Sequence, residues 1–181
     1  MIHSMTFLVT ALIVLFTSVN AWCQKEGGVE RTGDILQVAV PFTAALSTVV
    51  YKDNSNATWQ FANAFGSSML ITHGLKRTIN KQRPSGGNYS FPSGHTTAAF
   101  SGAAFIHYRY GFKPSIVFYG FSAYVAWSRV YAAKHDWVDV SAGAAIGIAS
   151  SYLFAKKYEF EWGSASLGTS GMGLTLTLHF D

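Results

Sequence analysis

The sequence contains little cysteine and few charged residues. Its 181 residues include one cysteine, Cys23, which excludes an internal disulfide framework and a metal cluster held by thiolates. Asp, Glu, Lys and Arg together make up 12% of the chain, which is about half of the share usual in soluble domains. Hydrophobic residues make up 49% and aromatic residues 15%, which excludes a disordered chain. We therefore expect one domain that is bound to a membrane or lies along its surface.

Acidic residues are absent from the middle of the sequence. No Asp or Glu occurs between residues 54 and 135, whereas the same segment contains the basic residues Lys76, Arg77, Lys81, Arg83, Arg109, Lys113, Arg129 and Lys134. This excess of positive charge predicts an anionic partner, and its less specific interpretation is a basic face beside anionic lipid headgroups. We do not expect nucleic acid as a partner, because apolar runs interrupt the basic residues and the net charge is only +4.

The N-terminus has the pattern of a targeting segment. Residues 7–16 are almost wholly apolar, and the small residues Ser18 and Ala21 follow where a signal peptidase would cut. We expect residues 1–21 to be a cleaved signal peptide, with a first transmembrane helix as the alternative. In both cases the rest of the chain crosses a membrane, and the bacterial periplasm is the simplest compartment.

The remaining sequence predicts an all-α bundle of five core helices in one domain, residues 22–157. Apolar runs bounded by capping residues, glycines and prolines place these helices at residues 35–51, 58–82, 93–110, 115–131 and 135–157. Asp34 is placed to cap the first helix, and Pro84 stops the second. Many small residues in the last helix favour close contacts between helices, as in membrane bundles.

The last residues, 158–181, change to a period of two. Aromatic residues alternate with glutamates over 158–162, and apolar residues alternate with polar ones over 174–180. A glycine-containing segment, 168–171, separates the two runs. This pattern predicts a C-terminal β-hairpin.

Three short patches carry the chemistry, and the first surrounds Lys76 and Arg83. These two residues are seven positions apart, close to two helical turns, so we expect both to project from one side of a helix. An ammonium and a guanidinium on one side suit a phosphate. His73 lies one turn before Lys76 and either lines the site or is an ordinary helix-face histidine with a hydrogen-bond partner, which we favour.

The second patch is Phe91-Pro92-Ser93-Gly94-His95, at the start of a helix. Its ordinary interpretation is helix capping. Its functional interpretation is an anion-binding nest, made by the Ser93 hydroxyl and the free N–H groups of Ser93, Gly94 and His95 at the positive end of the helix. Gly94 has no Cβ, so the backbone can approach a phosphate oxygen.

The third patch is Ser128-Arg129, followed by His135 and Asp139. His135 and Asp139 are four apart at a helix start and therefore lie on one face. A carboxylate that holds one imidazole nitrogen as N–H leaves the other as a free lone pair, able to act as nucleophile or base.

In this order, the three patches resemble the signatures of the type 2 phosphatidic acid phosphatase superfamily, which includes bacterial acid phosphatases and vanadium haloperoxidases. The match runs from Lys76 to Asp139 in motif and over about residues 34–157 with the flanking helices. The Gly-Gly-Asn-aromatic loop at 86–89 further resembles the small bacterial lipid A 1-phosphatases. The resemblance implies the helical bundle of this superfamily.

The resemblance also implies a role for each matching residue. Phosphate oxygens would be bound by a set of five residues, and three more would be catalytic. His135 would attack phosphorus and form a phosphohistidine, Asp139 would orient it, and His95 would protonate the leaving oxygen and then activate water. The binding set is Lys76, Arg83, Ser93, Gly94 and Arg129. No metal or other cofactor is implied, because cations and a helix N-terminus supply the electrostatic stabilisation.

The resemblance leaves the substrate open. We expect a lipid phosphate or pyrophosphate at the periplasmic face of the inner membrane, with lipid A 1-phosphate favoured by the loop. Undecaprenyl pyrophosphate and phosphatidylglycerol phosphate are alternative substrates. A soluble periplasmic acid phosphatase and a lipid phosphotransferase are alternative functions, and the oligomeric state is not predicted.

Overall fold

The structure is a computed structural model that describes residues 27–51, 56–158, 166–170 and 173–177. The expected signal peptide or first transmembrane helix, residues 1–21, lies outside these residues and stays a prediction.

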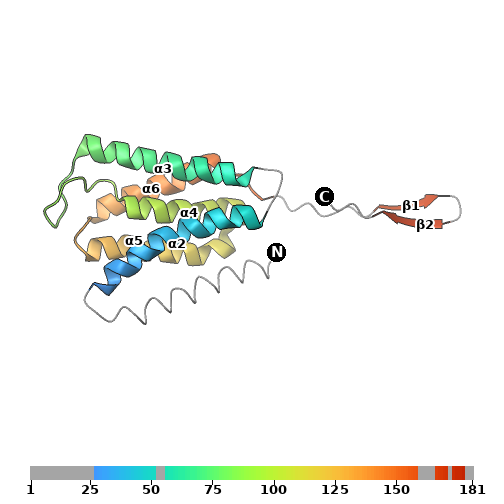
Figure 1. The fold of residues 1–181 in the computed structure, drawn as a ribbon, viewed down its shortest axis with the longest axis horizontal. Coiled ribbons are helices and arrows are strands. Elements are labelled where there is room, and N and C mark those ends of the chain that lie inside the picture. The colour runs from blue at the N-terminus through green and yellow to red at the C-terminus, as the bar shows by residue number, and fades with distance from the viewer. Residues whose placement is uncertain (1–26, 52–55, 159–165, 171–172, 178–181) are drawn as a thin grey trace.

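Five helices form a bundle, as the sequence predicted (Figure 1). They are α2 (Gly28–Val50), α3 (Ala57–Ile79), α4 (Gly94–Tyr110), α5 (Phe112–Tyr131) and α6 (Trp137–Phe154). Helix α4 is central and packs against each of the other four. The N-terminal ends of α2, α4 and α6 meet the C-terminal ends of α3 and α5 at one end of the bundle, on the left in Figure 1.

The interior of the bundle is made mostly of small and hydroxyl-bearing side chains. Alanines are buried beside serines and threonines, and Thr72 and Ser151 make hydrogen bonds to the neighbouring helix α4. Of the large apolar side chains, Phe105, Ile106 and Phe118 belong to the buried core. Many others lie on the outside, where Phe42 is 65% exposed and Leu70 is 76% exposed. Such a bundle has small residues at its helix contacts and apolar side chains outside, the arrangement of helices packed in lipid.

Glycine allows α6 to approach α4 at the end where the helices meet. A Cβ on Gly143 would lie 2.5 Å from the carbonyl oxygen of Ser93, so only glycine fits there without displacing one helix. The backbone N–H of Ser93 donates to the carbonyl oxygen of Asp139 over 2.9 Å. The start of α4 and the first turn of α6 are therefore fixed to each other.

Several helix boundaries differ from the sequence-based expectation: α5 begins at Phe112 rather than at residue 115, and α6 spans Trp137–Phe154 rather than residues 135–157. Two further differences, in α2 and α3, concern residues of the site. Helix α2 begins at Gly28, so Asp34 lies in its second turn and does not cap it. Helix α3 ends at Ile79, because Asn80 adopts a left-handed conformation with φ 43°, and the chain leaves the helix before Gln82. The expectation that Lys76 and Arg83 share a helix face was therefore wrong, since Arg83 lies in the loop that follows.

The C-terminal residues include two short strands, β1 (Ser166–Ser170) and β2 (Gly173–Thr177), which pair antiparallel. Strand β1 contains residues 168–170, which we had expected in the turn, and residues 159–162 of the expected first strand lie outside the described residues. The all-helical bundle is the confirmed part of the fold. The hairpin predicted at 158–162 and 174–180 stays a prediction.

Candidate active site

The three patches come together at the end of the bundle where the five helices meet. Lys76 is in the last turn of α3, Ser93 caps α4, and Arg129 is in the last turn of α5. His135 follows in the loop after α5, and Asp139 lies in the first turn of α6. Residues spread over positions 76–139 thus surround one small region, as the motif order led us to expect.

His135 and Asp139 form a buried pair at the base of this region. His135 is 4% exposed and Asp139 is 0% exposed. The Nδ1 atom of His135 lies 3.5 Å from Oδ2 of Asp139 and 3.4 Å from the hydroxyl oxygen of Ser90. Because Nδ1 faces these oxygens, Nε2 is the nitrogen that remains for a substrate.

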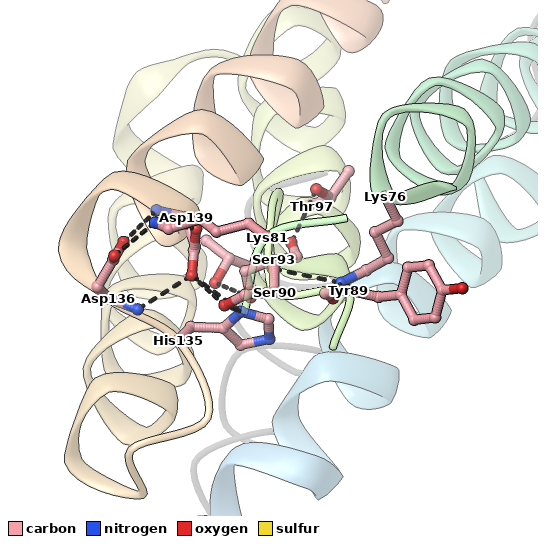
Figure 2. A network of polar contacts seen from close by, with 10 residues as sticks. Lys76, Lys81, Tyr89, Ser90, Ser93, Thr97, His135, Asp136 and Asp139 are labelled. Carbon is pink, nitrogen blue, oxygen red and sulfur yellow. Dashed lines mark hydrogen bonds and ion pairs between the residues drawn. The ribbon is translucent and has the colours of Figure 1, made fainter. Parts of the chain in front are cut away.

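Asp139 is held by more groups than the sequence suggested (Figure 2). Its Oδ1 accepts from Lys81 Nζ over 2.8 Å, and its Oδ2 accepts from the Ser90 hydroxyl and from the backbone N–H of Asp136. Lys81 also donates to Asp136, which caps α6 in a reciprocal capping box with Asp139. These contacts fix the carboxylate before any ligand binds.

The electrostatic surroundings keep His135 neutral. Burial, together with the positive charges of Lys76 and Arg83, lowers the pKa of His135 to about 4, against a smaller opposing effect of Asp139. The imidazole therefore carries a free lone pair at neutral pH. This is the protonation state that a nucleophile requires.

Arg129 is held from α2, at a residue that the sequence analysis treated only as a helix cap. The guanidinium is 3% exposed and donates to Asp34 Oδ1 over 2.8 Å and to the carbonyl oxygen of Glu30 over 2.6 Å. Asp34 Oδ1 also lies 3.1 Å from Nε2 of His95. Asp34 thus joins a predicted phosphate-binding residue to the predicted general acid.

Close approach of α2 to Arg129 depends on Gly33. A Cβ at this position would lie 2.1 Å from the Ser128 hydroxyl oxygen and 2.8 Å from Nη2 of Arg129. The glycine therefore makes room for the arginine between the two helices.

Lys76 and Arg83 approach the same region by different routes. Lys76 Nζ donates to the carbonyl oxygens of Tyr89 and Ser90 over 2.8 and 3.4 Å. Arg83 lies in the loop, yet its charge acts on both Lys76 and His135. Within the described residues, Nε of Arg83 is buried and has no hydrogen-bond partner, which leaves it for an anion.

The predicted nest at the start of α4 is smaller than expected. The N–H of Ser93 is used by the carbonyl oxygen of Asp139, and the Ser93 hydroxyl oxygen accepts from Thr96 over 3.1 Å. The N–H groups of Gly94 and His95 belong to the first turn and have no partner within the helix. Two backbone N–H groups, rather than the expected three, are therefore left for an anion at the N-terminal end of α4.

The assembled site suits a phosphate better than a metal ion. Lys76, Arg83 and Arg129 supply positive charge, while Asp139 and Asp34 are each tied to a cation. No group of three metal-ligating side chains is found in the part of the chain that the structure describes. Metal independence stays a prediction.

Four residues of the site were missed by sequence reasoning: Asp34, Lys81, Ser90 and Asp136. Lys81 stands inside the first patch and Ser90 directly precedes the second, but neither matches a signature position. Asp136 had the only readable signal, because Asp136 and Asp139 have the spacing of a capping box. His73 is exposed on the face of α3, and its expected hydrogen-bond partner stays a prediction.

Comparisons with known proteins identify a family and relatives of the chain. The family profile described as PAP2 superfamily matches residues 57–162. The chain is 27% identical to a lipid A 4'-phosphatase of Helicobacter pylori over 80% of this chain and 83% of that protein. It is 30% identical to a lipid A 1-phosphatase of the same species over 66% of this chain and 64% of that protein.

A solved structure shares the fold. The crystal structure of Aquifex aeolicus LpxE matches with a TM-score of 0.61 at 20% identity, over 78% of this chain and 92% of that chain. The helical bundle predicted from the sequence is thus found in a second protein.

Proposed function

The chain belongs to the PAP2 superfamily, and from this premise we propose that it is a metal-independent lipid phosphatase that works through a phosphohistidine on His135. Its homology to lipid A phosphatases supports the phosphatase activity. The observation that carries the proposal is the neutral, buried His135, backed by Asp139 and surrounded by cations.

The first step transfers the phosphoryl group to the protein. Nε2 of His135 attacks phosphorus, the bond from phosphorus to the leaving oxygen breaks, and His95 gives that oxygen a proton. Lys76, Arg83 and Arg129 stabilise the charge on the equatorial oxygens, and the N–H of Gly94 adds a hydrogen bond. Ser93 positions the start of α4, where its N–H is bonded to α6.

The second step returns the free enzyme. His95 takes a proton from water, the oxygen attacks phosphorus, and the P–N bond breaks to release phosphate and neutral His135. Asp139 stabilises the positive imidazolium while the intermediate exists. An alcohol in place of water would make the protein a phosphotransferase.

We further propose that the substrate is a glycolipid of the lipid A type, at the periplasmic face of the membrane, with the 1-phosphate as the first position to test. The relatives named above act on lipid A, at the 1- and the 4'-position. The apolar exterior of the bundle fits a substrate drawn from a membrane. Helices α2 and α6 are long and apolar enough to cross one.

The test is phosphate release by purified protein in detergent with EDTA present. The panel contains lipid A, undecaprenyl pyrophosphate, phosphatidylglycerol phosphate and p-nitrophenyl phosphate. We expect the wild-type protein to release phosphate from lipid A and His135→Ala to release none. His107→Ala removes a histidine at the far end of α4 and is the matched control, which should remain active. Radiolabelled substrate should leave an acid-labile label on the wild-type protein only.

Each other outcome identifies a different function. Preference for another lipid would keep the mechanism and change the substrate. Turnover of the soluble ester alone, by protein released from cells without detergent, would indicate a periplasmic acid phosphatase. Full activity of His135→Ala would refute the mechanism.

A further inference from the structure

A pocket of about 480 Å³ opens beside the candidate phosphate site and is lined by His73, Lys76, Arg77 and Tyr89. We propose that this pocket binds a second phosphate, carried by a sugar headgroup, while the scissile phosphate lies at His135. The inference rests on the proposed lipid phosphatase function and specifies which substrate class the site accepts.

The walls of the pocket come from one helix and one loop. His73, Lys76 and Arg77 are separated by three and four positions, so they line one face of the last turns of α3. Tyr89 faces them from the loop between α3 and α4, and its ring lies beside Lys76 (Figure 2). The pocket is thus built where α3 ends and the loop turns back.

Tyr89 is held in place although its side chain is 48% exposed. Its carbonyl oxygen accepts a hydrogen bond from Lys76 over 2.8 Å, and the next residue, Ser90, donates its N–H to the carbonyl oxygen of Lys81. Its φ of 62° is a conformation that a large residue rarely adopts. Contacts on both sides therefore present this aromatic ring to the pocket at a cost in backbone energy.

The chemistry of the lining selects an anion. It combines an ammonium, a guanidinium, an imidazole and a phenol, and none of these four side chains is acidic. The carboxylate Asp139 is turned away and tied to Lys81. A guanidinium and an imidazole both donate to phosphate oxygens, and the phenol ring offers a flat surface to a sugar.

Lys76 connects the pocket to the reaction centre. Its ammonium lines the pocket, and its charge also acts on His135. The volume falls within the range of about 300–1,000 Å³ that small-molecule pockets occupy, which is more room than one phosphate needs. A headgroup that begins at His135 can therefore continue past Lys76 into the pocket.

The test compares two substrates that differ by one phosphate and have the same acyl chains. One is lipid A, and the other is its monophosphorylated form that keeps only the phosphate to be hydrolysed. We expect Arg77→Gln to lower kcat/KM for the bisphosphorylated lipid by about tenfold or more, as for loss of one charged hydrogen bond. The value for the monophosphorylated lipid should stay within about twofold, because that lipid has no second phosphate for Arg77 to bind. Arg77→Lys should restore part of the difference, and Lys113→Gln, the control, should leave both values unchanged.

Equal losses on both lipids, or no loss on either, would overturn the pocket assignment. If the wild-type protein releases phosphate from neither lipid, the proposed function fails and binding still tests the pocket. For this purpose, His135→Ala and His135→Ala with Arg77→Gln are titrated with micelles of each lipid. Tighter binding of the bisphosphorylated lipid that disappears with Arg77 supports the pocket, and equal binding contradicts it.

Discussion

Single side chains in the site are arranged so that each carboxylate is neutralised by a basic partner. Asp139 is paired with Lys81, and Asp34 with Arg129. An unpaired carboxylate here would repel a phosphate, whereas a paired one can position a histidine without that penalty. We therefore expect these pairs to determine the rate of reaction as much as the residues that touch phosphate.

Lys81 is the first of these pairs to test. Lys81→Met removes the cation that bridges Asp136 and Asp139, so the Asp139 carboxylate loses a fixed position beneath His135. We expect kcat to fall about 10- to 100-fold with little change in KM. Losses of this size are seen in metal sites when the hydrogen-bond partner that orients a metal-binding residue is removed. Lys81→Arg should restore most of the rate.

The matched control for Lys81 is Lys134→Met, which breaks a nearby exposed pair with Glu30 at 3.5 Å. Exposed pairs contribute little, so its kinetics should match those of the wild type. A rise in KM at unchanged kcat in Lys81→Met would instead assign Lys81 to substrate binding.

Asp34 positions two groups from outside the matched family region. Asp34→Asn keeps the shape of the side chain but removes the charge that holds Arg129 and contacts His95. We expect inhibition by orthovanadate, a phosphate analogue, to weaken about tenfold, because an uncharged amide oxygen holds the Arg129 guanidinium less strongly than a carboxylate does. Inhibition constants measure this effect, and an unchanged constant would limit Asp34 to a structural role.

His135 gives the site a defined pH dependence. Its pKa of about 4 means that the nucleophile loses its lone pair only in acid, so the acid limb of kcat/KM due to this group should lie below pH 5. Lys76→Met removes a positive charge that lowers this pKa and should move the limb to higher pH. Lys113→Met, the control, should leave the acid limb where it is. An acid limb that stays at the same pH in Lys76→Met would contradict its assignment to His135.

The lowered pKa of His135 also makes the stability of the folded protein depend on pH. The unfolded chain binds a proton at this histidine near pH 6.5, while the folded protein binds it only near pH 4. The unfolded state is therefore favoured as the pH falls from about 6.5 to 4. Unfolding midpoints measured across this range should decrease with decreasing pH.

At the level of helices, the site depends on how closely α6 lies against α4. Gly143→Ala would place a methyl group 2.5 Å from the Ser93 carbonyl oxygen, so the two helix starts must separate. We expect a loss of about 1–3 kcal/mol in the free energy of unfolding, the usual cost of overpacking. Phosphate release should fall with it, because Ser93 and Asp139 move apart.

Gly120→Ala is the matched control, since a Cβ at Gly120 in α5 would meet nothing within 4 Å. Alanine favours a helix by up to about 1 kcal/mol over glycine, so this variant should be at least as stable as the wild type. Thermal unfolding in detergent compares the two, and equal midpoints would show that α6 can move without cost.

Local sequence patterns predicted the helices well and their ends less well. Apolar runs and motif spacing depend on neighbours in the chain, which is why His135 and Asp139 were expected close together. Nδ1 of His135 does lie 3.5 Å from Oδ2 of Asp139, but His135 precedes α6, so the two residues do not share the helix face that we expected. The end of α3 was missed because Pro84 is a stronger signal for a helix end than Asn80, which follows a last turn with Lys76 and Arg77. The pairs of Lys81 with Asp139 and of Asp34 with Arg129 join residues 58 and 95 positions apart, and only tertiary packing reveals them.

Across the described residues, many large apolar side chains lie outside, and most buried side chains are small or carry a hydroxyl group. Val38 on α2 and Leu153 on α6 are exposed, and these two helices are the candidate membrane spans. Lipid favours this exterior, and small interior residues allow the close packing that holds helices together there. The site lies at one end of the bundle, so the orientation of the protein decides which side of a membrane it serves.

That orientation can be measured with one cysteine at each end of the bundle. In a Cys23→Ser background, Asn88→Cys places a thiol on the exposed loop at the site, and Lys113→Cys places one at the opposite end, near the start of α5. We expect a membrane-impermeant maleimide added to spheroplasts to label the first variant and to label the second only after permeabilisation. This pattern is expected if the site lies on the periplasmic side of the membrane, as proposed. The reverse pattern would place the site in the cytoplasm, and labelling of both in protein washed free of membranes would contradict the spanning bundle.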